Sequence, residues 1–150
     1  MSESQKDNNL FYLCSLIEYI SRKTMNSKST IITIIGKDKI QKIYNLADIY
    51  HSENIDKISD ELVNEFNIKN GSYNVLKNTS KKYKIPTYWE IGRVYQNLIL
   101  RLSCSEDEYI NKFIEVMTSW IIEKIDNYNS SMYYENPDYI YACYLNGKCL

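Results

Sequence analysis

The chain has few of the residues that interrupt regular structure, with four Gly and two Pro among 150 residues. So little glycine excludes a collagen-like chain and disfavours a β-sandwich, whose many turns depend on Gly and Pro. Apolar residues make up 44% and charged residues 25% of the chain, which are ordinary proportions for a globular protein. The sequence therefore predicts one all-α domain over residues 1–150, a bundle of about six or seven helices.

An excess of charge of either sign is also missing, because 18 Lys and Arg balance 19 Asp and Glu to a net charge of −1. A large basic excess is the simplest indication of binding to nucleic acid or to a membrane. The usage within residue classes is nevertheless skewed, with 21 Ile, 16 Asn, 15 Lys and 15 Tyr but two Ala and three Arg. The frequent residues have A/T-rich codons, so the skew indicates a low-GC genome before it indicates a tyrosine-rich surface.

Long hydrophobic runs are absent as well. The apolar stretch over residues 10–20 is interrupted by Glu18 and is shorter than the roughly 18 residues that a transmembrane helix needs. Residues 1–9 are polar and lack the positive n-region of a signal peptide. None of the four cysteines belongs to a Cys-x-x-Cys pair, which argues against a zinc ribbon or a thioredoxin-like motif. We therefore expect a cytoplasmic protein with free thiols and no membrane contact.

Catalytic motifs are not found. No phosphate-binding glycine loop, serine-hydrolase elbow or H-E-x-x-H sequence occurs. The single histidine, His51, lies beside Glu53, but no recognisable motif fixes a nucleophile near it. Three carboxylate pairs lie opposite the apolar stripes, where solvated charge is expected: Asp60/Glu61, Asp107/Glu108 and Glu123/Asp126. We predict a protein that is not an enzyme, with no catalytic residue, metal or cofactor.

Apolar residues recur at helical spacing through most of the chain. We expect helices over residues 10–24, 38–50, 55–66, 87–103, 106–126 and 139–145, with 10–24, 87–103 and 106–126 at the centre. Residues 1–8 are expected to be disordered, and residues 67–86 to form a basic loop between two helical halves.

The segment from Ser27 to Gly36 can be interpreted in two ways. Its β-branched residues indicate a strand, whereas a Ser/Thr cap at its start and a glycine at its end indicate a short helix. No second strand is available nearby to pair with it, which favours the helix.

Helix 10–24 is apolar around nearly its whole circumference, more than the stripe of about 100° that a peripheral helix needs. Either it is the central helix or it meets a second chain, and we favour a homodimer. Tyrosines are dense between residues 128 and 144; such rings either pack the final helix onto the bundle or contact another protein. The candidate interaction residues are Phe11, Tyr12, Tyr19, Trp89, Tyr133 and Tyr134.

The segment from Lys69 to Lys84 contains five lysines and no acid, with Tyr73 and Tyr83 among them. Lysines neutralise phosphates and tyrosines stack on bases, so this loop is an alternative site for RNA or single-stranded DNA. The lack of arginine there and the acidity of the rest of the domain favour a solvated linker instead. The candidate nucleic-acid contacts are Lys77, Lys81, Lys82 and Lys84.

Four phrases carry a resemblance to a known family: LFYLCSLIEYI (10–20), ADIYHSENIDKI (47–58), PTYWEIGRVY (86–95) and YYENP (133–137). Over nearly its whole length the chain resembles a family of small uncharacterised bacterial proteins. Members of that family are often encoded beside ADP-ribosyltransferase-like proteins and small helical partners, in a toxin–antitoxin-like arrangement. The resemblance implies a protein that acts through protein–protein interaction, antitoxin-like or as the accessory partner of a neighbouring effector. It implies no catalytic residues.

Overall fold

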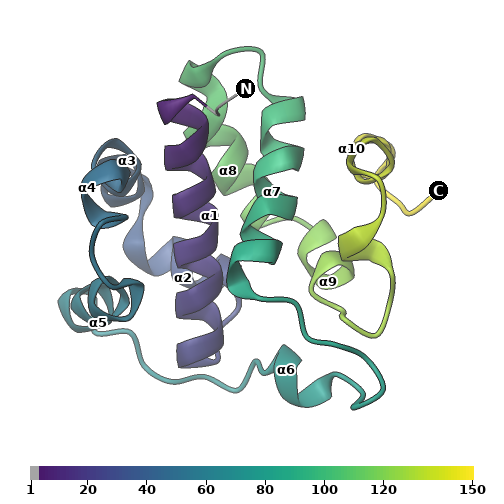
Figure 1. The fold of residues 1–150 in the computed structure, drawn as a ribbon, viewed down its shortest axis with the longest axis horizontal. Coiled ribbons are helices and arrows are strands. Elements are labelled where there is room, and N and C mark those ends of the chain that lie inside the picture. The colour runs from purple at the N-terminus through teal and green to yellow at the C-terminus, as the bar shows by residue number, and fades with distance from the viewer. Residues whose placement is uncertain (1–3) are drawn as a thin grey trace.

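The computed structural model describes residues 4–150, which form an all-helical fold (Figure 1). The all-α prediction is confirmed, and no strand occurs between residues 4 and 150. Over these residues there are ten α-helices, joined by two 3-10 turns at Glu106–Glu108 and Met132–Tyr134. The helices are α1 (Gln5–Thr24), α2 (Lys28–Ile35), α3 (Lys37–Asn45), α4 (Ala47–Tyr50), α5 (Ile55–Glu65), α6 (Val75–Asn78), α7 (Tyr88–Leu102), α8 (Tyr109–Met117), α9 (Ile121–Ile125) and α10 (Pro137–Asn146).

The expected number of helices, six or seven, is too low because two of the expected helices are interrupted and because α6 forms within the segment 67–86 that was expected to be a loop. The helix expected over 38–50 divides at Leu46 into α3 and α4, and the one expected over 106–126 becomes a 3-10 turn, α8 and α9. At the second break the hydroxyls of Thr118 and Ser119 donate to the carbonyls of Ile114 and Val116, both at 2.7 Å. Such side-chain bonds compete with the helical ladder.

Local capping chemistry places several helix ends where the sequence predicts them. The segment from Ser27 to Gly36 is helical, since the Ser27 side chain accepts the Thr30 amide at the start of α2 and Gly36 follows its end with φ +84°. Thr87 and Glu90 form a capping box at the start of α7. Asn136 caps α10, whose first residue is proline.

The prediction that residues 1–8 are disordered is wrong for residues 5–8. The Ser4 side chain accepts the amide of Asp7 at 3.1 Å, and α1 begins at Gln5. Residues 5–8, which were expected to be disordered, are therefore helical, while residues 1–3 lie outside the described part of the chain.

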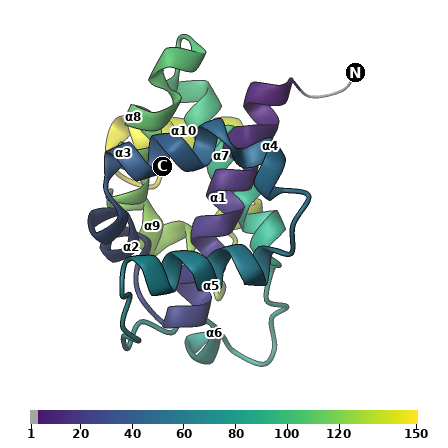
Figure 2. The same cartoon turned by 90° about the vertical axis from the view of Figure 1, so that its left-hand side faces the viewer.

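Helix α1 lies at the centre of the fold. It packs most extensively against α7, and α2, α3, α4 and α5 also contact it. Figure 2 shows α3, α4 and α5 crossing in front of it. Lys23 near its C-terminal end pairs with Asp56 and Asp60 of α5. Because its own chain covers α1, the apolar circumference of this helix no longer argues for a second copy, and the homodimer stays a prediction.

The segment 67–86, which we call the strap, is fastened to the bundle and is not a free loop. It contains α6 and runs beneath the helices from α5 to α7 (Figure 1). The amides of Gly71 and Tyr73 donate to the carbonyls of Thr24 and Met25, both at 2.8 Å. Gly71 is required there, because a Cβ would lie 2.6 Å from the Met25 carbonyl oxygen.

None of the helices in the described chain combines the length and the apolar character needed to cross a lipid bilayer.

We predict that Gly92→Ala destabilises the protein, although alanine is the better helix former. Gly92 marks the close approach of α7 to α1, and a Cβ there would lie 2.1 Å from Ser15 Oγ and 2.9 Å from Ser15 Cα. Overpacking of this kind costs about 1–3 kcal/mol, which chemical denaturation will measure.

The partner variant Ser15→Gly provides the control. In the Gly92→Ala background it should cost less stability than in the wild type, because it removes the Oγ and Cβ atoms of Ser15, although the close Cα remains. Equal costs in the two backgrounds would contradict the close approach.

Candidate functional site

Four charged side chains meet inside the bundle, and we call them the ionic cluster: Glu18 and Arg22 of α1, Lys28 of α2, and Asp126 just after α9. Lys28 Nζ lies 2.5 Å from Glu18 Oε1 and 2.6 Å from Asp126 Oδ2. Arg22 Nε lies 2.7 Å from Glu18 Oε2. Lys28 and Glu18 are each 1% exposed and Asp126 is 2% exposed, so these three side chains are almost completely removed from water, while Arg22 is partly exposed.

Two tyrosines and a backbone carbonyl complete the hydrogen bonding of the cluster. The Tyr95 hydroxyl donates to Asp126 Oδ1 at 2.8 Å, and the Tyr128 hydroxyl donates to Glu18 Oε2 at 3.3 Å. Arg22 Nη2 donates to the carbonyl of Pro86 at 2.8 Å. Two positive charges thus balance two negative ones, which is the condition under which charges are tolerated in a protein interior.

The cluster also changes the proton affinities of its members. Burial opposes the charge of Lys28, but the nearby Asp126 and Glu18 raise its pKa above the ordinary value. Burial likewise opposes ionisation of Glu18, yet Lys28 and Arg22 lower its pKa. Burial and the charge of Glu18 raise the pKa of Asp126, which has Lys28 as its one cationic partner. Of the two carboxylates, Glu18 is therefore the stronger acid.

A second feature is a row of partly exposed rings, which we call the aromatic surface: Phe11, Tyr19, Tyr88, Trp89 and the exposed His51. Ring centroids are 5.5 Å apart between Phe11 and Trp89, 5.0 Å between Trp89 and Tyr88, and 4.9 Å between Tyr88 and Tyr19. His51 lies 5.5 Å from Trp89. Because α1 and α7 pack side by side, rings from two distant parts of the sequence form one row.

The structure brings together three of the six predicted interaction residues at the surface, Phe11, Tyr19 and Trp89. Tyr12 lies beneath them, 1% exposed, and belongs to the core because its position on α1 faces inward. Tyr133 and Tyr134 lie elsewhere. Tyr133 packs against Tyr128 at 5.6 Å, while Tyr134 is 67% exposed.

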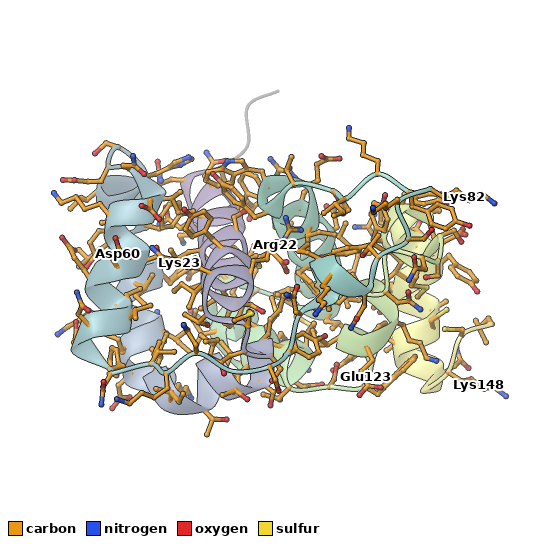
Figure 3. All side chains as sticks on the ribbon, turned by 90° about the horizontal axis from the view of Figure 1, so that it is seen from below. Arg22, Lys23, Asp60, Lys82, Glu123 and Lys148 are labelled. Carbon is orange, nitrogen blue, oxygen red and sulfur yellow. The ribbon has the colours of Figure 1, made fainter. Side chains whose placement is uncertain are left out.

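The lysines of the strap point outward. The candidates Lys77, Lys81, Lys82 and Lys84 are all exposed, and Figure 3 shows Lys82 projecting from the edge of the molecule. Tyr83 is 44% exposed, with Lys82 Nζ 5.8 Å from its ring centroid. Tyr73 is instead half-buried, because its backbone is fastened to Met25.

Sequence reasoning missed the ionic cluster. Asp126 was expected to be solvated with Glu123; Glu123 is exposed, but Asp126 is buried, so that prediction is wrong for Asp126. Two local signals point to the cluster. Glu18 and Arg22 lie four residues apart on a helix that is apolar on nearly every side, so their charges have no solvent-facing stripe and are expected to pair. Asp126 directly follows the buried Ile125.

The charged residues otherwise behave as expected. Asp60, Glu61 and Asp107 are exposed, and Glu108 is partly so. Among residues 4–150 no group of three or more His, Cys, Asp or Glu side chains is placed to hold a metal ion.

Comparison with models of protein families, with curated proteins and with solved structures finds no match to this chain.

We predict that Lys28→Met destabilises the protein by about 3–5 kcal/mol, because it leaves two buried carboxylates with Arg22 as the remaining cation. Urea unfolding followed by circular dichroism measures the change. Lys124→Met, at an exposed position on α9, is the control and should change the stability by less than about 0.5 kcal/mol.

The stability difference between the wild type and Lys28→Met should also depend on pH. In the wild type the lowered pKa of Glu18 means that its stabilisation is present above its unfolded pKa and is lost as the pH falls through its folded pKa. The raised pKa of Asp126 has the opposite sign, and removal of Lys28 should enlarge that effect. In Lys28→Met we expect the buried carboxyls to have raised pKa values, so the variant gains stability as the pH falls from neutral. The difference between the two proteins should therefore shrink between about pH 7 and pH 5. A constant difference would contradict the ionic cluster.

Proposed function

We propose that this chain is a non-enzymatic protein-binding module, a cytoplasmic bacterial protein that acts as an antitoxin-like or accessory partner of a neighbouring effector. The observation that supports the proposal is the aromatic surface, where Phe11, Tyr19, Tyr88 and Trp89 are each partly exposed and touch one another.

Rings in this arrangement suit a protein interface. Tyr and Trp offer large, stiff contact areas with polar tips, and they are enriched among the residues that dominate binding energies. The guanidinium carbon of Arg93 lies 3.9 Å from the centroid of the Phe11 ring, which adds a third residue type common in such hot spots. Tyr19 is also held in place, because its hydroxyl donates to Asp56 Oδ1 at 2.7 Å.

The ionic cluster supports the non-enzymatic part of the proposal. Its charges pair with one another across 2.5–2.7 Å. Burial and the surrounding carboxylates raise the pKa of Tyr95 and Tyr128 well above the ordinary value. These hydroxyls therefore stay protonated and act as hydrogen-bond donors to the cluster.

The partner in this proposal is another protein or a second copy of the chain. Light scattering at micromolar concentration separates the two. A mass near 17.8 kDa gives a monomer that awaits a different partner, and twice that mass gives the homodimer.

The strap provides the second candidate function, binding of RNA or single-stranded DNA. The specific observation in its favour is that Lys77, Lys81, Lys82 and Lys84 are all exposed next to the exposed Tyr83. Binding of this kind falls steeply with salt, and the double variant Lys81→Glu/Lys82→Glu should abolish it.

We predict that the double variant Tyr88→Ser/Trp89→Ser loses the partner while it stays folded. Both side chains are partly exposed, so their removal takes contact area from an interface. Trp89 also packs against the core, so we expect some loss of stability as well. Co-purification with the products of the neighbouring genes, each tested as a defined protein, measures the binding, and thermal unfolding checks the fold.

The matched control is Tyr134→Ser, which removes the most exposed tyrosine outside the aromatic surface and should leave the partner bound. If Tyr134→Ser breaks the complex and the double variant does not, the aromatic surface is not the interface.

A further inference from the structure

A cavity of about 320 Å³ lies between the strap and the chain that follows α9. This volume is at the lower end of the range for small-molecule sites. The strap provides Tyr73, Val75, Asn78 and Thr79, and the other side is formed by Glu123 and residues 126–129. No residue of the aromatic surface lines it, so an inference from this cavity is independent of the proposed function.

Hydrogen bonds hold the two walls of the cavity in place. Asn129 Nδ2 donates to the carbonyl of Asn78 at 3.0 Å, and Asn129 Oδ1 accepts the amide of Ser80 at 2.7 Å. Asn127 Oδ1 in turn accepts the Asn129 amide at 3.1 Å. Because the strap is also fastened to residues 24 and 25 at its other end, the cavity is formed before any ligand arrives, which lowers the entropic cost of binding.

The charged residues that line the cavity, Glu123 and Asp126, are both acidic. Asp126 is neutralised from the inner side by Lys28, at 2.6 Å. Glu123 is exposed, and Figure 3 shows it at the periphery of the molecule on α9. Lys28 pairs with Asp126 and Glu18 and not with Glu123. Glu123 is therefore the carboxylate that a cationic ligand in this cavity meets.

A tyrosine adds to the preference for positive charge. Tyr73 and Tyr128 both line the cavity, but Tyr128 is 2% exposed and already has the guanidinium carbon of Arg22 5.7 Å from its ring centroid. The half-buried ring of Tyr73 is therefore the one available to a ligand, and the face of an aromatic ring attracts a cation. A cation–π contact of this kind occurs in the neighbouring ionic cluster, where Lys28 Nζ lies 5.1 Å from the ring centroid of Tyr95. Burial and the charge of Asp126 raise the pKa of Tyr73 to about 12, so its hydroxyl is neutral at physiological pH.

The cation that fits is organic rather than metallic. A zinc-type site needs three or more His, Cys, Asp or Glu ligands in one place, and residues 4–150 contain no such group. The cavity is lined instead by the carboxylate of Glu123, by Tyr73 and by asparagine and threonine residues, and carboxylate oxygens accept the N–H donors of an alkylammonium group. We infer that this cavity binds a small protonated amine, with Glu123 as its counter-charge and Tyr73 as an aromatic wall.

Calorimetric titration with the diamine putrescine, at constant ionic strength, tests the inference. The neutral probe is 1,4-butanediol, which has the same length and no charge. We expect saturable binding of putrescine with a Kd on the order of 1 mM or tighter and no binding of the diol. Glu123→Gln should weaken putrescine binding at least about tenfold, because it removes a charged hydrogen-bond acceptor.

Two further variants sharpen the result. Tyr73→Leu, which removes a half-buried ring, should also weaken the binding. Asp107→Asn, an exposed carboxylate outside the cavity, should leave it unchanged. If Tyr73→Leu fails to fold, the comparison of Glu123→Gln with Asp107→Asn still decides.

Three results would overturn the inference: no saturable binding of putrescine, equal binding of the diol, or equal weakening by Asp107→Asn and Glu123→Gln. None of them bears on the aromatic surface, because the protein partner is measured separately.

Discussion

The contact of Lys28 with Glu18 and Asp126 is the interaction on which the other features depend. It joins α1, α2 and the end of α9 at one point, and the hydroxyl of Tyr95 adds α7. In a medium of low polarity each of these charges is stable only while its partners stay in place. The cluster therefore requires four elements, far apart in the sequence, to keep one mutual arrangement.

The same cluster positions the strap and the cavity. Arg22 reaches from the cluster to the carbonyl of Pro86, where the strap ends and α7 begins. Asp126 and Tyr128 belong both to the cluster and to the cavity lining. A cavity built on such residues has a rigid floor, which loops on a protein surface rarely have. The aromatic surface lies on another part of the α1–α7 pair, so the two proposed binding regions are physically separate.

How far the sequence predicts this structure depends on how local each determinant is. Helix ends were predictable where a few neighbouring residues decide them, as with Ser27 and Gly36. The break in the helix expected over 106–126 was not, because the apolar spacing continues across Thr118 and Ser119. On α1, apolar on nearly every side, the sequence could not say which rings face outward, so Tyr12 was grouped with Phe11 and Tyr19. The ionic cluster could not be predicted from the sequence, because Lys28 and Asp126 are 98 residues apart and only the folded chain brings them together.

A double-mutant cycle between Lys28 and Asp126 tests the central claim most directly. Lys28→Met, Asp126→Leu and the double variant are unfolded with urea at neutral pH, and the coupling free energy is calculated from the four stabilities. In Lys28→Met the buried Asp126 loses its cation, and in Asp126→Leu the buried Lys28 keeps only Glu18. The double variant removes both of these groups and leaves Glu18 paired with Arg22, so if the cluster ties the fold together the coupling should be about 2 kcal/mol or more. A coupling near zero would mean that the two side chains do not depend on each other and would contradict the account.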